Sequence, residues 1–253
     1  MKRVLRHVLF YAGLLGLWVL IAELKIWPPY LVPTPWGVGE SLYSGFQDHS
    51  YWIAIGVSMR RVLIGYGISV TLGMFLGLAI SSNSFLEETL GGLLVSLQSL
   101  PSICWWPLAL IWFGLSQKAI LFVVVMGSLL SVTMSMEDGR KQIPKIYSMA
   151  GRNLGASGLK LFWYVLLPAS LPYFVSGLKQ GWAFAWRSLI AAEMLYVSLG
   201  LGQVLMMGRE TNDMNAVIAV MLLIVALGYL VDGVAFRTME RRLQHKWGLV
   251  PAA

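Results

Sequence analysis

The sequence predicts an all-α membrane protein with six transmembrane helices. Hydrophobic residues make up 57% of the 253 residues and charged residues only 12%, and the mean hydropathy is +0.69. Soluble domains usually carry about 25% charged residues, so this composition favours a chain that crosses a membrane several times. No part of the sequence alternates between polar and apolar residues as a half-buried strand does.

Six runs are long enough to cross a bilayer, for which a helix needs about 20 mostly apolar residues. They lie at residues 8–26, 58–80, 90–113, 118–136, 168–195 and 214–236. Lys2, Arg3 and Arg6 precede the first run as they would in a signal peptide, but no small-residue cleavage site follows, so we expect a retained span. Pro101 and Pro107 interrupt the third run, and we expect the helix to bend or break there.

The placement of basic residues predicts the orientation in the membrane. An even number of spans puts both termini on one side. If that side is the cytoplasm, 12 of the 19 Lys and Arg residues lie inside and 5 outside, and Lys179 and Arg187 fall within the fifth span. Cytoplasmic loops carry an excess of Lys and Arg, so we expect a multi-pass protein of the cell (inner) membrane with both termini in the cytoplasm. The net charge of +7 then reflects orientation, and we expect no nucleic-acid partner.

The chain is predicted to be a single transmembrane domain over residues 1–253, with its core at about 56–236. The outer connection, residues 27–57, contains four prolines and then an amphipathic run from Val38 to Phe46, which predicts a short surface helix. Ser69, Gly73 and Gly77 occupy every fourth position of the second span. That spacing lets a neighbouring helix approach closely, either within the chain or in a second subunit.

The longest cytoplasmic connection, residues 137–167, has the pattern of two short helices. The first is expected from Tyr147 to Leu154 and ends at Gly155, which can adopt the left-handed conformation. Ser157 is a candidate N-cap for a second helix through Leu166, and Pro168 then opens the fifth span. Four apolar residues lie close in sequence to the basic Arg152 and Lys160. These are Leu154, Leu159, Phe162 and Trp163. The residues alone leave two interpretations open, a docking surface for another protein or a helix lying on the lipid headgroups.

The same segment resembles the coupling loop of the membrane subunits of ABC importers. Those loops carry Glu-Ala-Ala, three residues, Gly, nine residues, Ile, one residue and Leu-Pro. Here Ala150, Gly151 and Gly155 match, followed after nine residues by Val165-Leu166-Leu167-Pro168, whereas Met149 replaces the Glu. The stretch Pro107 to Gly114 is similar to the branch that takes up nitrate, bicarbonate, taurine and alkanesulfonates.

The resemblance implies a permease subunit with a type I, methionine-importer-like fold, which imports a small oxyanion such as an aliphatic sulfonate, taurine or nitrate. It implies a second permease copy that forms a homodimer with this one, a cytoplasmic ATPase dimer that holds ATP and Mg, and an extracytoplasmic substrate-binding protein. It also assigns ATPase docking to one run of residues: Met149, Ala150, Gly151, Arg152, Asn153, Leu154, Gly155, Ala156 and Ser157. A thiamine-precursor-like heterocycle as substrate is an alternative, as is a secondary transporter that works without an ATPase.

Two cations and several tryptophans are candidates for the substrate pathway. A charge within a membrane span normally faces the bundle interior or an aqueous cavity. Lys179 and Arg187 are eight residues apart, so both can line one broad helix face beside Trp182 and Trp186. Lys179 can equally reach the membrane surface, and Arg187 can bond to backbone carbonyls. Trp105 and Trp106 line either the pathway or the membrane interface. Glu193 is expected to be structural, paired with Arg209 or Arg187.

Several kinds of catalytic and metal site are missing from the sequence. It contains no Gly-x4-Gly-Lys-Ser/Thr motif, so we expect no ATP hydrolysis by this chain, no cofactor of its own and no enzymatic activity. His7, His49 and His245 are far apart in the sequence, so we expect no metal site and no serine–histidine protease centre.

Overall fold

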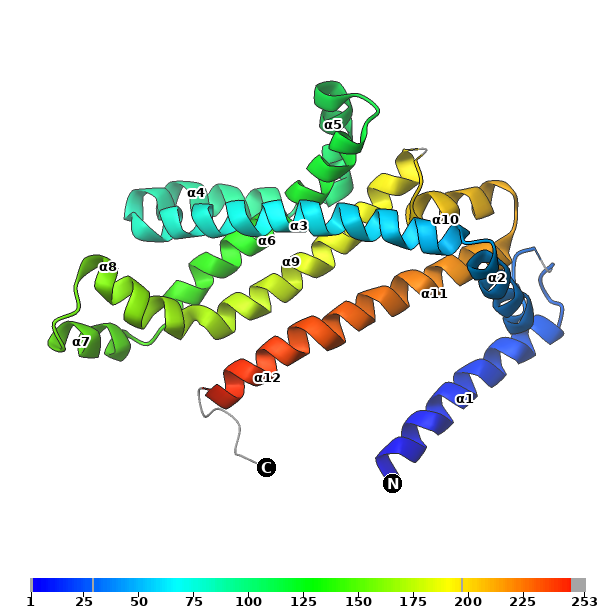
Figure 1. Cartoon of the computed structure of the whole chain (residues 1–253), viewed down its shortest axis with the longest axis horizontal. Coiled ribbons are helices and arrows are strands. Elements are labelled where there is room, and N and C mark those ends of the chain that lie inside the picture. The colour runs from blue at the N-terminus through cyan, green and yellow to red at the C-terminus, as the bar shows by residue number, and fades with distance from the viewer. Residues whose placement is uncertain (1, 29, 197, 247–253) are drawn as a thin grey trace. The chain divides into compact units, whose positions relative to one another are not determined.

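The computed structural model describes residues 2–28, 30–196 and 198–246, and these residues form helices and no strands (Figure 1). The α-helices are α1 (Lys2–Glu23), α2 (Pro35–Gln47), α3 (Ser50–Ser82), α4 (Ser84–Gln98), α5 (Trp106–Phe113), α6 (Gln117–Lys141), α7 (Lys145–Asn153), α8 (Gly158–Leu161), α9 (Leu167–Leu195), α10 (Leu201–Glu210), α11 (Met214–Val231) and α12 (Arg237–Lys246). A 3-10 helix, η1 (Ser102–Trp105), and two π-helical turns, η2 (Phe162–Leu166) and η3 (Asp232–Phe236), complete the described elements.

The predicted all-α class is confirmed, and five of the six predicted spans correspond to helices, one of them a bent pair, that are long and apolar enough to cross a membrane. In the described residues, four helical segments are long and apolar enough to cross a membrane, or five if a bent pair counts as one span. The four are Leu5–Glu23, Ser50–Ser81, Gln117–Gly139 and Met214–Leu243. The predicted span 168–195 does form the 29-residue helix α9. Polar residues such as Lys179 and Gln180 make this helix less apolar than the four segments above.

The third predicted span bends, as the prolines at 101 and 107 suggested. The chain bends by 102° between the segments Phe85–Gln98 and Ser102–Phe113. Figure 1 shows α5 turning away from the axis of α4. Proline lacks the backbone N–H that an α-helix needs and also disfavours helical geometry in the residue before it. Helix α4 therefore ends at Gln98, and Pro107 lies within the first turn of α5. The predicted bend is confirmed.

The chain divides into two compact units. The first comprises residues 1–59 and 193–227, and the second comprises residues 60–192 and 228–253. In the first unit, the predicted surface helix is present as α2. Its N-cap is Thr34, whose Oγ1 accepts a hydrogen bond from the Gly37 N–H at 3.1 Å. The indole of Trp18 on α1 donates to the Pro33 carbonyl at 2.9 Å and so ties α1 to the start of that helix.

A buried carboxylate, that of Glu193, helps to cap a helix of the first unit. Glu193 is fully buried, and its Oε2 accepts hydrogen bonds from Ser58 Oγ at 2.7 Å and from the Gly202 N–H at 3.1 Å. Ser58 Oγ in turn accepts from the Leu201 N–H at 2.9 Å. The first N–H groups of a helix have no partners within it, so Glu193 and Ser58 together cap α10. Glu193 thus has a structural role, as expected, and its hydrogen bonds from the Ser58 hydroxyl and the Gly202 N–H contribute to it.

The core of the second unit is built around α6, which α3 approaches along a row of small residues. A Cβ on Gly73 would lie 2.9 Å from a Val132 methyl, and one on Gly77 would lie 2.6 Å from Met136 Cβ. Between the helices, Ser128 Oγ donates to Ser69 Oγ at 2.7 Å. The spacing of small residues that left two interpretations open therefore serves packing within the chain.

Helix α9 approaches α6 equally closely from another direction. A Cβ on Gly181 would lie 2.7 Å from the second methyl of Val132, and one on Gly127 would overlap Ser188 Oγ. Val132 is fully buried, so one valine of α6 fills the space left by a glycine on each neighbouring helix. The positions of α3 and α9 are thus set by contacts that tolerate no added methyl group.

Two glycines of α3 allow this packing to be tested. We predict that Gly77→Ala destabilises the fold by about 1–3 kcal/mol, because the new methyl would overlap Met136 Cβ and the Thr133 carbonyl oxygen, 2.6 and 2.7 Å away. Neither atom can be moved by a change of rotamer. Thermal unfolding of the purified chain in detergent measures the loss.

Gly67→Ala is the matched control, because nothing lies within 4 Å of its Cβ position on the same helix. Alanine is the better helix former, so this variant should be as stable as the parent or slightly more so. Equal melting temperatures for the two variants would contradict the close packing of α3 on α6.

Candidate functional site

The predicted coupling loop between α6 and α9 folds into a helical hairpin, and the turn after α7 explains its glycine. The Ala156 N–H bonds to the Gly151 carbonyl and the Gly155 N–H to the Arg152 carbonyl, both at 2.9 Å. This pair of bonds is the Schellman motif, which satisfies carbonyls at a helix end and requires a left-handed residue. Gly155 supplies it with φ +83°, so the conformation predicted for this glycine is confirmed.

A second glycine lets the two arms of the hairpin touch. Gly151 is buried on α7, and a Cβ there would lie 2.6 Å from Leu161 Cδ1 and 3.0 Å from Val165 Cγ2. Figure 1 shows α7 and α8 folded back beside one another between the ends of α6 and α9. Gly151 occupies the second Ala position of the family motif, and the packing requires a small residue there.

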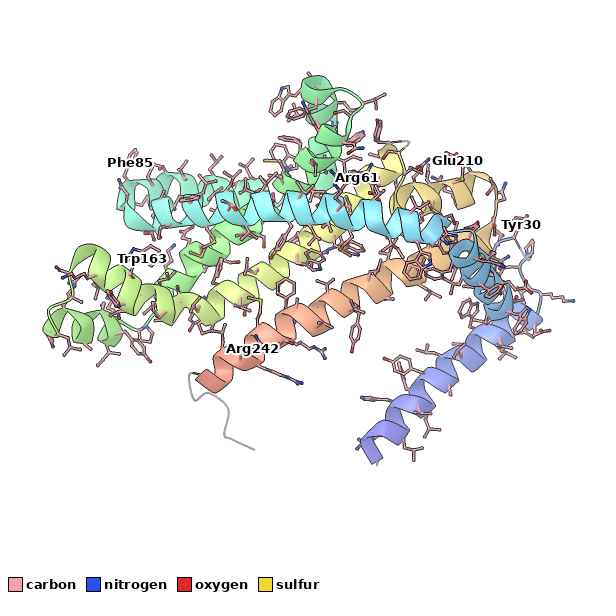
Figure 2. The ribbon with its side chains drawn as sticks, viewed as in Figure 1. Tyr30, Arg61, Phe85, Trp163, Glu210 and Arg242 are labelled. Carbon is pink, nitrogen blue, oxygen red and sulfur yellow. The ribbon has the colours of Figure 1, made fainter. Side chains whose placement is uncertain are left out.

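The second arm differs from the single helix expected from Ser157 to Leu166. Helix α8 covers only Gly158–Leu161, and a π-helical turn over Phe162–Leu166 continues into α9. Pro168 lacks an N–H and its ring would crowd the carbonyl four residues earlier. A wider turn just before it relieves that conflict, as π-helical turns do within longer helices. Figure 2 labels Trp163 in this turn.

The hairpin exposes apolar side chains to its surroundings. Leu154 is 88% exposed, and Ile146 and Met149 are 70% and 58% exposed. Arg152 and Lys160 are exposed beside them, and Trp163 is exposed on the second arm. Two members of the predicted apolar surface, Leu159 and Phe162, have side chains that lie outside the described residues. Exposed apolar groups next to cations are typical of a surface that another protein covers, and the docking role itself stays a prediction.

An ion-pair cluster anchors the base of the hairpin. Lys141, at the end of α6, bonds to Glu137 at 2.7 Å and to Glu87 of α4 at 3.0 Å. The hydrogen bonds to Glu137 and Glu87 raise the pKa of the Lys141 ammonium above its ordinary value of 10.5. A raised lysine pKa contributes stability that is complete below pH 10.5 and is lost only as the pH rises through the folded value. The cluster is therefore intact at physiological pH.

The candidate pathway residues line two cavities of the second unit. The smaller cavity, of about 270 Å³, lies where α4 breaks before η1, and its wall includes Ser99, Ser102, Trp105 and Arg187. The larger cavity, of about 540 Å³, lies between α9 and the segment 228–232, and its wall includes Lys179, Trp182, Trp186, Arg187 and Asp232. Arg187 belongs to both walls. Broken helices at membrane depth commonly line the sites of transporters.

The cations of these cavities have different partners. Lys179 Nζ forms an ion pair with Asp232 Oδ1 at 3.2 Å. Arg187 donates from Nε to the Ala183 carbonyl of its own helix at 3.0 Å, and its guanidinium lies over the Phe184 ring at 4.8 Å. Within the described part of the chain no carboxylate forms an ion pair with Arg187. Trp106 is buried at the start of α5 and lines neither cavity.

Sequence reasoning missed Asp232 and the two serines beside the helix break, Ser99 and Ser102, which line the smaller cavity. Asp232 was the acidic residue within the last apolar run, and a carboxylate in such a run normally has a partner; that signal was present. The serines beside the break gave no signal, because serine is common in turns and caps. Which residues carry substrate stays a prediction.

Comparison with known proteins places these features in a family. A family model described as the binding-protein-dependent transport system inner membrane component matches residues 69–245. The taurine transport system permease protein TauC of Escherichia coli (strain K12) is 28% identical over 237 residues, which cover 92% of this chain and 86% of that protein. The nitrate import permease protein NrtB of Synechocystis sp. is 26% identical over 239 residues, covering 91% and 86%.

A solved structure supports the fold. A chain of the MetNI methionine ABC transporter, solved in inward-facing conformations, matches with a TM-score of 0.61 at 21% identity, covering 76% of this chain and 97% of that one. At 21% sequence identity, this similarity supports a shared fold. The predicted methionine-importer-like fold is therefore confirmed.

Proposed function

Because the chain belongs to the family of binding-protein-dependent transport system inner membrane components, we propose that it is the transmembrane permease subunit of an ATP-driven importer for a small oxyanion. The hairpin over residues 145–166 is the observation that carries this proposal. It is a helical element with an exposed apolar surface, and it continues directly into α9. A partner ATPase bound to the hairpin can therefore move α9, which lines both cavities.

The proposed partners follow from the lack of an ATP-binding motif in the sequence and from the exposed surface of the hairpin. The sequence has no phosphate-binding Gly-x4-Gly-Lys-Ser/Thr motif, so a cytoplasmic ATPase dimer has to supply ATP and Mg chemistry. An extracytoplasmic binding protein delivers the substrate, and a second copy of the chain completes the path. The hairpin faces the cytoplasm in this arrangement, with both termini on the same side, in agreement with the excess of Lys and Arg there.

The substrate class is supported by the charge of the cavities and by the names of relatives. Taurine and nitrate, which appear in those names, are both small and carry an anionic oxygen group. The pair of Lys179 and Asp232 is neutral as a whole, so Arg187 leaves the larger cavity with a net positive charge. A positive cavity within a membrane protein favours an anion. Alternating access then exposes this cavity to one side of the membrane at a time.

The docking role of the hairpin can be tested by the ATPase activity that accompanies the chain. The tagged chain is purified from its own host, and vanadate-sensitive ATP hydrolysis is measured. We predict that Leu154→Asp lowers this activity at least about tenfold, because an exposed leucine at the centre of an interface is replaced by a charge.

Ile26→Asp is the matched control, because Ile26 is also an exposed apolar residue, at 65%, in the turn after α1. It should retain the activity. If Leu154→Asp retained it equally, the hairpin would not be the docking element.

The turn of the hairpin allows a test of energy coupling. Gly155 has φ +83° and open space around its Cβ position, so Gly155→Val acts through backbone strain of about 1–2 kcal/mol and not through a clash. We predict that the purified complex still hydrolyses ATP but that ATP-driven uptake into proteoliposomes falls strongly. Gly92→Val, at a helical position with equally open space, should preserve the ratio of uptake to hydrolysis. A normal ratio in Gly155→Val would contradict the proposed transmission.

The positive cavity allows a test of the path. Arg187→Ala should reduce kcat/KM for uptake of labelled sulfonate about tenfold or more, the amount typical for losing hydrogen bonds to a charged group, while the complex still assembles. Arg187→Lys, which keeps the charge, should recover part of the loss. Arg209→Ala removes an exposed arginine from α10 and serves as control. Unchanged kinetics in Arg187→Ala would remove this residue from the path.

A further inference from the structure

Helix α2 of the first unit belongs at a membrane surface, because of the helices that precede and follow it. Segments Leu5–Glu23 and Ser50–Ser81 are each long and apolar enough to cross a bilayer, and α2 is the helix between them in the chain. Two consecutive spans are joined at one face of the membrane, where the lipid headgroups lie. The side chains that α2 turns away from the protein therefore meet headgroups, water or another protein.

One face of α2 is packed closely within the first unit. Val38 is 2% exposed, and a Cβ on Gly45 would lie 2.5 Å from the ring of Tyr51, at the start of α3. On Gly37, a Cβ would lie 2.5 Å from Asn215 Oδ1 of α11. These contacts leave no room for added atoms, so they determine which face of α2 points outwards.

The outward face of α2 carries two aromatic rings. Trp36 and Tyr43 are 78% and 71% exposed, and they lie about 10.5 Å apart along the helix axis, at 1.5 Å per residue. Gly39 and Glu40 lie between them on the same face, since residues at i, i+3, i+4 and i+7 share one face of a helix. Nothing lies within 4 Å of the Cβ position of Gly39, so the space between the rings is open.

This open space is a groove of about 710 Å³ whose wall is mostly apolar and contains one acidic group, Glu40. The lining residues are Pro35, Trp36, Gly39, Glu40, Tyr43 and Ser44. The indole N–H of Trp36 donates to Glu40 Oε1 at 2.9 Å and so holds the carboxylate beside the ring. Glu40 forms no ion pair within the part of the chain that the structure describes. The groove therefore presents an unbalanced negative charge between two aromatic side chains.

A negative charge flanked by aromatic rings is complementary to an organic ammonium group. The face of an aromatic ring attracts a cation, most strongly for Trp, and a carboxylate accepts strong hydrogen bonds from a charged N–H donor. Trp and Tyr are also typical of the headgroup level of a membrane. The ethanolamine headgroup carries a primary ammonium that can donate to Glu40. A phosphatidylglycerol headgroup carries no cation, and its negative phosphate would be repelled by the carboxylate.

We propose that this groove binds the headgroup of phosphatidylethanolamine, with its ammonium beside Glu40 and between the side chains of Trp36 and Tyr43. The acyl chains of the lipid then continue into the bilayer. The bound lipid covers the exposed aromatic face and holds α2 at the membrane surface. This site depends neither on what the chain transports nor on its cytoplasmic partners.

Lipid retention by the purified full-length chain tests this site. The chain in detergent is incubated with equal amounts of phosphatidylethanolamine and phosphatidylglycerol that have the same acyl chains. Native mass spectrometry then measures how much of each lipid stays bound. We expect phosphatidylethanolamine to be retained at least about threefold more than phosphatidylglycerol, because an exposed cation–π contact and an exposed ion pair each make a modest contribution.

Substitution of the carboxylate locates the lipid. Glu40→Gln removes the charge but keeps the shape of the side chain, and it should abolish the preference for phosphatidylethanolamine. Glu210→Gln is the matched control, because Glu210 is an exposed carboxylate at the end of α10 in the same unit. It should preserve the preference.

Substitution of an aromatic ring tests the second part of the site. Trp36→Leu should lower the preference at least about twofold, since the ring no longer attracts the ammonium. Trp52→Leu removes an exposed indole that does not line the groove, and it should leave the preference unchanged. All four substituted side chains are exposed, and circular dichroism confirms that each variant is folded.

Three results would overturn the proposal. Equal retention of the two lipids by the parent chain would show that the groove does not select an ammonium headgroup. An unchanged preference in Glu40→Gln and Trp36→Leu would place the lipid elsewhere. An equal loss in Glu40→Gln and Glu210→Gln would show that the net charge of the chain decides retention. Either of the first two results would leave the outward face of α2 to water or to another protein, such as a second copy of the chain.

Discussion

The second unit depends on how closely α3 and α9 approach α6. Val132 fills the space opposite a glycine on each neighbour, with one methyl toward Gly73 and the other toward Gly181. In a membrane the hydrophobic effect does not drive helices together, so close contact and hydrogen bonds such as that between Ser128 and Ser69 have to do so. This requirement explains why small residues recur along α3 and α9 and why so much of α6 is buried.

The same contacts decide where the chemistry lies. The face of α9 that includes Gly177 and Gly181 packs on α6, so the cations and tryptophans, which lie at other angles around the helix, are left to line cavities. Arg187 therefore occurs in the walls of both cavities, and Asp232 meets Lys179 on the other side of the larger one. The position of the positive charge is thus a result of glycine packing elsewhere on the same helix.

Much of this architecture could be predicted from the sequence, because membrane helices and glycine turns leave local signals. Apolar runs marked most of the helices, the prolines marked the break after α4, and Gly155 marked the turn of the hairpin. Features that depend on distant parts of the chain could not be predicted. The cap on α10 needs Ser58 and Glu193, which lie 135 residues apart. The π-helical turn before Pro168 and the pairing of Lys179 with Asp232 likewise depend on geometry that no local pattern encodes.

One proline inside α9 interrupts its backbone ladder. Pro172 withholds an N–H from the helix, so the carbonyl of Pro168 four residues earlier lacks its usual partner, and helices commonly kink at such a position. The interruption of the hydrogen-bond ladder thus lies next to the hairpin, whereas the longer part of the helix, which bears the cations, contains no further proline. A displacement of the hairpin would bend α9 near Pro172, and the parts of the cavity walls that lie on the rest of the helix would move with it.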